Sequence, residues 1–140
     1  MCGELNNQVL VEKICYDLGY NLENFISDST FAFFYEIRQK DENIGFIYQG
    51  NNHPFIHIMS MMFISEEDQN LLNLQCPPIL DFCKNRGSHY SVENDDGEPK
   101  LVLTISIPEE EFTAEKFVES LESIVSCLNN VSLFLKKLKN

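Results

Sequence analysis

Residues 55–64 constrain the fold of this 140-residue chain more than any other segment, because they are apolar at both alternating sets of positions. Side chains of a strand point alternately to its two sides, and an antiparallel sheet normally leaves one face in water. Both sides of this strand therefore need a cover, either helices of the same chain or another chain. Three of the four methionines lie here, and methionine suits adaptable surfaces as well as irregular cores.

Two strand patterns precede this segment, at residues 31–38 and 44–49. Turn-forming residues at 41–43 and 50–52 separate the three segments, and such short connections predict an antiparallel meander. The side chains expected to share one face of the first strand are Phe31, Phe33, Tyr35 and Ile37.

Short helices are predicted on both sides of the meander. Apolar residues at spacings of three and four indicate a helix over residues 9–18 that Gly19 closes, followed by a loop over residues 20–30. Ser65 precedes three acidic residues, as at a helix N-terminus, and the Pro77-Pro78 pair must break that helix. Residues 79–86 then read as a second short helix.

The C-terminal part adds two strands. Residues 89–93 form a weak strand pattern, residues 94–97 a strong turn, and residues 100–108 a clean alternation. The side chains of the last strand expected to face the core are Leu101, Leu103, Ile105 and Ile107, and those expected to point outward are Val102, Thr104 and Ser106.

A long helix closes the chain. Thr113 can cap it, and Phe112 can pack on Phe117 as a hydrophobic staple. Apolar residues then step by four and three as far as Leu138. The stripe is broader than a coiled-coil seam, which favours packing across a sheet.

These elements predict an α+β fold in the order helix-β-β-β-helix-β-β-helix. The antiparallel sheet has about five strands, and the long C-terminal helix packs on it. Residues 1–140 are expected to form a single domain, since no composition shift marks a linker.

Composition excludes two classes of partner. Ten Lys and Arg against 22 Asp and Glu leave a formal net charge of -12. Nucleic-acid binders derive much of their affinity from basic residues that neutralise phosphates, so no nucleic-acid partner is expected. An anionic membrane surface is disfavoured for the same reason.

The compartment is expected to be the cytoplasm. No segment approaches the roughly 20 apolar residues that span a bilayer, and the N-terminus lacks the basic flank and apolar core of a secretory signal. The five cysteines are odd in number and scattered, which indicates reduced thiols.

No catalytic or metal signature is present, so neither a cofactor nor a metal is expected. Removal of the initiator methionine would leave Cys2 as an N-terminal nucleophile, as in glutamine amidotransferases, but the accompanying motifs of those enzymes are missing. His53 and His57 lie in extended sequence, where a spacing of four need not bring their side chains together. Cys76 and Cys83 have a spacing that no usual zinc module uses.

The order of elements resembles the YbjN family and the class I type III secretion chaperones. The resemblance is carried by the meander over residues 31–64, residues 79–85 before Gly87, the hairpin at residues 95–97 leading into residues 101–107, and the helix over residues 109–138. It implies a cytosolic, often dimeric protein that binds other proteins. The chaperones wrap an extended segment of a secreted client around their surface.

We therefore expect a non-enzymatic protein-binding module, chaperone-like or regulatory, that forms a homodimer and binds an extended polypeptide client. Strand addition at a sheet edge and apolar pockets would provide the contacts. The residues expected to contact the partner are Phe34, Met59, Met61, Met62, Ile79, Leu80 and Phe82.

Two alternatives remain. One is a regulatory domain that senses a small molecule held between the sheet and the helices by Phe33, Tyr35 and Phe46. The other is a Cys2-dependent enzyme similar to the amidotransferases.

Overall fold

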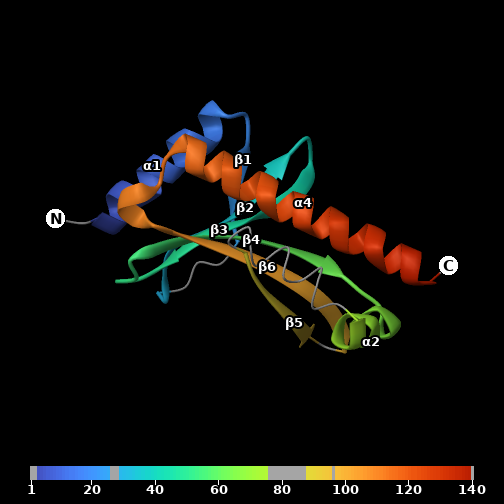
Figure 1. Ribbon diagram of the computed structural model, residues 1–140. Coiled ribbons are helices and arrows are strands. Elements are labelled where there is room, and N and C mark those ends of the chain that lie inside the picture. The colour runs from blue at the N-terminus through green and yellow to red at the C-terminus, as the bar shows by residue number, and fades with distance from the viewer. Residues whose placement is uncertain (1–2, 26–28, 76–87, 96, 140) are drawn as a thin grey trace. The chain divides into compact units, whose positions relative to one another are not determined.

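The computed structural model describes residues 3–25, 29–75, 88–95 and 97–139. It confirms an α+β fold whose antiparallel sheet carries the long C-terminal helix (Figure 1). The elements are α1 (Gly3–Asp17), β1 (Asn21–Asn24), β2 (Phe31–Gln39), β3 (Glu42–Gly50), β4 (Phe55–Phe63), α2 (Glu66–Gln75), β5 (His89–Asp95), β6 (Glu98–Pro108), the 3-10 turn η1 (Glu109–Glu111) and α4 (Ala114–Lys139).

The sheet has six strands in the order β1-β2-β3-β4-β6-β5, one more strand than expected. The additional strand, β1, lies within residues 20–30, which we expected to form a loop. Its sequence, Asn-Leu-Glu-Asn, has little strand propensity, and its pairing with β2 makes it extended. The expected helix over residues 79–86 lies outside the described residues.

The described chain divides into two compact units. Unit 1 comprises residues 1–58 and 106–119, and unit 2 comprises residues 59–105 and 120–140. β4, β6 and α4 contribute residues to both units, and each unit is described separately below.

In unit 1, α1 contacts β2 through Tyr35. The Tyr35 hydroxyl accepts a hydrogen bond from Gln8 at 2.7 Å and donates one to Glu12 at 2.9 Å. Burial and the adjacent Glu12 carboxylate raise the pKa of Tyr35, with the Gln8 bond opposing them. This side of the sheet therefore belongs to the core of the unit.

A register shift between Phe31 and Phe33 corrects the expected face of β2. The Phe31 ring contacts Phe34 and Tyr48, so it does not share a face with Phe33 and Tyr35, which stack on each other. A bulge adds one residue to one strand and so breaks the strict alternation of side chains between the two faces. The sequence of a single strand does not reveal where this happens.

The β2–β3 connection is tighter than the turn expected at residues 41–43. Gln39 pairs with Glu42, so Lys40 and Asp41 form a two-residue loop with φ angles of 51° and 65°. Two positive φ angles are typical of a type I′ turn, which matches the twist of the flanking strands.

The predicted end of α1 and the predicted cap of α4 are confirmed, but α1 begins at Gly3 and not at residue 9 as we expected. Gly19 (φ 88°) follows α1, and the amides of Gly19 and Tyr20 reach back to the carbonyls of Tyr16 and Cys15, as in a Schellman motif. At the start of α4, the Lys116 amide donates to the Thr113 hydroxyl at 3.1 Å.

The staple at the start of α4 is also present. The rings of Phe112 and Phe117 lie 6.2 Å apart, and both side chains are buried.

In unit 2, Ser65 caps α2 as expected. The Asp68 amide donates to the Ser65 hydroxyl at 3.0 Å, and the Ser65 amide donates to the Asp68 carboxylate at 3.1 Å, so the two residues form a capping box. The turn expected at residues 94–97 is shorter, because β5 extends to Asp95 and β6 begins at Glu98.

The core of unit 2 is apolar. Leu101 and Leu103 are fully buried as predicted, and Val102, which we expected to point outward, is also buried, so both faces of this part of β6 are covered. The buried apolar side chains of α4 in this unit are Leu121, Ile124, Cys127, Val131 and Leu135, and Ser120 is buried beside them in the sequence.

Candidate functional site

The residues expected to bind a partner lie in different environments. Phe34 is only 7% exposed, because its ring stacks on Tyr48 at 4.7 Å and contacts Phe25 and Phe46. A partner would reach this ring only if its neighbours moved. The expected contact residues Met59, Met61 and Met62 are half-buried on β4, whereas Ile79, Leu80 and Phe82 lie outside the described residues.

A row of rings crosses one sheet face of unit 1. Phe34 stacks on Tyr48, Tyr48 stacks on His57 at 4.9 Å, and His57 lies 5.1 Å from His53, measured between ring centroids. The two histidines therefore do lie together, which the sequence spacing did not lead us to expect. Pro54 lies between them in the connection that precedes β4.

The surroundings of His57 favour the uncharged form of its ring. Its Nδ1 lies 2.7 Å from the Ser106 hydroxyl of β6. Burial lowers the pKa of His57, and the nearby His53 lowers it further, since both favour the uncharged ring. Within the described ranges, no group of three or more His, Cys, Asp or Glu side chains is placed to hold a metal ion.

The rings proposed to line a small-molecule site do not share one cavity. Phe33 and Tyr35 stack on the side of β2 that faces α1. Phe46 contacts Phe25 and Phe34 on the opposite side. All three rings are at least nine-tenths buried and pack against protein side chains.

The described thiols are not arranged as nucleophiles. Burial raises the pKa of Cys15 to about 12, and Cys127 is fully buried. Cys2, Cys76 and Cys83 lie outside the described residues.

A buried amide connects three segments of unit 1. Gln49 is fully buried, and its Nε2 donates to the Glu109 carboxylate and to the His53 carbonyl, both at 2.7 Å. Asn7 of α1 donates to the same Glu109 oxygen at 2.8 Å and to Gln49 Oε1 at 3.2 Å. These bonds satisfy buried polar atoms and join α1, β3 and η1, which is a structural role.

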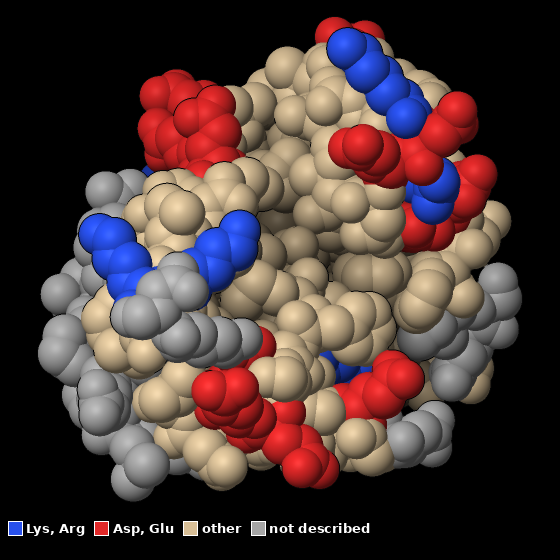
Figure 2. All heavy atoms as spheres, turned by 90° about the vertical axis from the view of Figure 1, so that its right-hand side faces the viewer, with Lys and Arg blue, Asp and Glu red and all other residues tan. Residues whose placement is uncertain are grey.

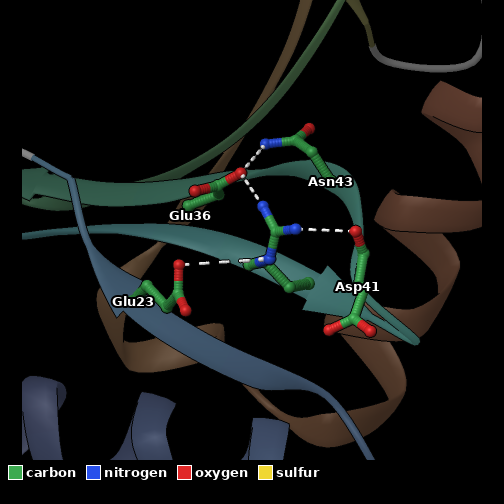
Figure 3. A network of polar contacts seen from close by, with 5 residues as sticks. Glu23, Glu36, Asp41 and Asn43 are labelled. Carbon is green, nitrogen blue, oxygen red and sulfur yellow. Dashed lines mark hydrogen bonds and ion pairs between the residues drawn. The ribbon is translucent and has the colours of Figure 1, made fainter.

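The side chain of Arg38 is occupied by acidic neighbours (Figure 3). It donates to Glu36 at 2.8 Å and to the Asp41 carbonyl at 2.6 Å, and it lies 4.0 Å from Glu23 on β1. Asn43 donates to the same Glu36 carboxylate at 2.6 Å. Because these groups surround the guanidinium, Arg38 fastens β1 and the β2–β3 hairpin and does not offer a free anion site.

β5 lies at the edge of the sheet in unit 2. It pairs with β6 on one side, and no strand among the described residues pairs with its other side. Its described side chains are exposed except for Val92, which is half-buried. The solvent-exposed fraction of Tyr90 is 43%.

The register shows which amides of β5 point outward. The Pro99 carbonyl accepts a hydrogen bond from the Ile64 amide at 3.1 Å, so the polar backbone of Pro99 points away from β5. Pro99 is opposite Asn94, and this pair therefore lacks hydrogen bonds between β5 and β6. Hydrogen-bonded and non-hydrogen-bonded pairs alternate in an antiparallel ladder, so the backbone N–H and C=O of Tyr90, Val92 and Asn94 face the open edge.

The sequence led us to expect strand addition but did not indicate at which edge of the sheet. The segment that forms β5 gave the weakest of the strand patterns, because edge strands lack the apolar alternation of buried ones. Pro99 was the available sequence signal for the direction of the backbone. A proline can sit in a strand only where its missing N–H is not required for pairing.

Comparison with known proteins supports the fold. A solved structure of an uncharacterized protein from Methanothermobacter thermautotrophicus is similar over 94% of this chain and 97% of its own, with a TM-score of 0.69 and 15% sequence identity. No family model and no curated protein sequence matches the chain. Among the described residues, no helix is both long enough and apolar enough to cross a membrane.

Proposed function

We propose that this protein is a non-enzymatic, cytoplasmic polypeptide-binding module that receives an extended segment of its partner along the open edge of β5. The outward-facing backbone of Tyr90, Val92 and Asn94 carries the proposal. Alternate residues of an edge strand supply main-chain hydrogen bonds to an added strand, while exposed side chains such as Tyr90 supply selectivity.

The charge of the protein favours a neutral or basic partner. The net charge is -12, and Figure 2 shows one face on which charged side chains lie in separate groups with uncharged surface between them. On β5, Glu93 is exposed and accepts a hydrogen bond from Ser91 at 3.0 Å. A basic segment would be attracted to this edge, with an effect that salt weakens.

The resemblance to the YbjN family and the type III secretion chaperones agrees with this function, because those chaperones bind extended client segments. The similar solved structure supports the fold alone. A chaperone-like or regulatory role is therefore part of the proposal.

A library of random peptides displayed on phage, selected against the full chain, tests the proposal. Binding of a selected peptide is then measured by fluorescence anisotropy for the wild type and for Val92→Pro. The substitution removes an outward N–H but no hydrogen bond to β6, so the strand should persist. We expect at least about tenfold weaker binding, because one hydrogen bond is lost and the proline ring obstructs the added strand.

Val92→Thr is the matched control. It keeps the backbone N–H and the β-branched shape, and it should bind the peptide within about twofold of the wild type. Equal binding by the wild type and Val92→Pro, with both folded by circular dichroism, would contradict strand addition at β5.

A further inference from the structure

A small pocket lies in unit 2, at the end of β4. Its volume is about 160 Å³, and its lining combines apolar and polar side chains. Ile64 and Leu135 are buried and form the apolar floor, whereas Phe63 stands at the pocket with 69% of its surface exposed. Phe63 is the most exposed large apolar side chain among the described residues, so an apolar partner here would remove an unusually exposed ring from water.

The polar groups of the pocket come from two helices. Ser132 and Lys136 lie one turn apart on α4, and Asp68 lies in the first turn of α2. The capping box with Ser65 fixes the Asp68 carboxylate, which is 9% exposed. Lys136 is exposed and forms no ion pair with a described residue.

We propose that this pocket binds one aromatic ring that carries a hydroxyl group, that is, a phenol. The volume is that of a single ring, since a cavity of about 150 Å³ holds benzene. The lining holds both the buried Asp68 carboxylate and the exposed Lys136 ammonium group, so a ligand of one charge is attracted by one and repelled by the other. A neutral hydroxyl can donate to Asp68 and accept from Lys136 or Ser132.

The ring can come from a free phenol or from a tyrosine side chain of a polypeptide. The site is separate from the β5 edge, so it does not depend on the function proposed above. Two probes distinguish the sources: p-cresol, which is the tyrosine side chain alone, and the blocked tripeptide acetyl-Gly-Tyr-Gly-amide.

Titration of the full chain with p-cresol, followed by ¹H–¹⁵N NMR, tests the site. We expect saturable shifts at Phe63, Ser132 and Lys136, with a Kd of about 1 mM for so small a ligand. Toluene, which lacks the hydroxyl, should bind about fivefold more weakly. Saturation by the tripeptide identifies a side-chain site, and saturation by p-cresol alone identifies a site for free phenols.

Ser132→Leu fills the pocket and should abolish the saturable shifts. Asn129→Leu makes a similar polar-to-apolar change on the exposed side of α4, outside the pocket, and should leave them unchanged. The proposal is wrong if p-cresol causes no saturable shifts, if toluene binds as tightly, or if Ser132→Leu binds like the wild type.

Discussion

Replacement of Gln49 by leucine should strongly destabilise unit 1. The Gln49 side chain is fully buried and makes three hydrogen bonds, of which two are donated by Nε2. Leucine has nearly the same size, so a cavity contributes little to the change. The loss of stability comes from three groups that would each lose a hydrogen bond to Gln49: the Glu109 carboxylate, the His53 carbonyl and the Asn7 amide.

The magnitude follows from these three bonds. A hydrogen bond to a charged group contributes about 1.5–3 kcal/mol, and each of the two neutral bonds about 0.5–1.5 kcal/mol. We therefore expect Gln49→Leu to reduce the free energy of unfolding by about 3–5 kcal/mol. That is a large fraction of the roughly 5–15 kcal/mol by which domains are stable, and it corresponds to a fall in Tm of roughly 10–15 °C.

Urea unfolding followed by circular dichroism measures this change. Asn7→Ala is the comparison, because it removes one bond to Glu109 and one to Gln49 but leaves Glu109 with its Gln49 bond. Asn7 is only half-buried, so water can replace its lost bonds, and the variant should cost less than Gln49→Leu. The double variant Gln49→Leu/Glu109→Leu should cost less than the sum of the single changes, because neither side chain then leaves the other unpaired. A loss below about 1 kcal/mol for Gln49→Leu, with an unchanged m-value, would refute the structural role of this amide.

Three further changes test single features. The folded pKa of His57 is lowered from its ordinary value of 6.5, so acidification through that value should protonate the unfolded chain first and reduce stability; Tm measured between pH 7.5 and 5.5 should fall less for His57→Gln than for the wild type. Lys40→Asn should stabilise by about 0.5 kcal/mol, because asparagine tolerates the positive φ of 51° better, and an unchanged or lower urea midpoint would argue against a strained turn. The Ser88 hydroxyl is buried and has no hydrogen-bond partner among the described residues, so Ser88→Ala should be neutral or stabilising by up to about 1 kcal/mol; clear destabilisation in the same assay would contradict this.

The elements with strong local signals were predictable from the sequence. The α4 helix has a capping threonine, a phenylalanine staple and a long apolar stripe, and these signals agree with one another. β1 was missed because its extended conformation comes from pairing with β2 and not from its own residues. The same distinction explains Phe31, whose face depends on a register shift that only the partner strand reveals.

The candidate site was less predictable because it depends on backbone direction. The outward amides of β5 follow from the pairing of Pro99 with Asn94 and from the bond between Ile64 and Pro99, which join segments distant in the sequence. The proximity of His53 and His57 likewise required the path of the chain through Pro54.

Charge on the open edge bears on which partner β5 would accept. An open edge strand is a hazard, because it can pair with a second copy of itself, and proteins often protect such strands with charged residues. Glu93 is exposed on β5, Glu98 follows on β6, and each copy carries a net charge of -12. Two copies approaching through β5 would therefore repel each other, whereas a basic segment would not. A homodimer, which the sequence led us to expect, is for this reason better sought at another surface, leaving the β5 edge to a different polypeptide.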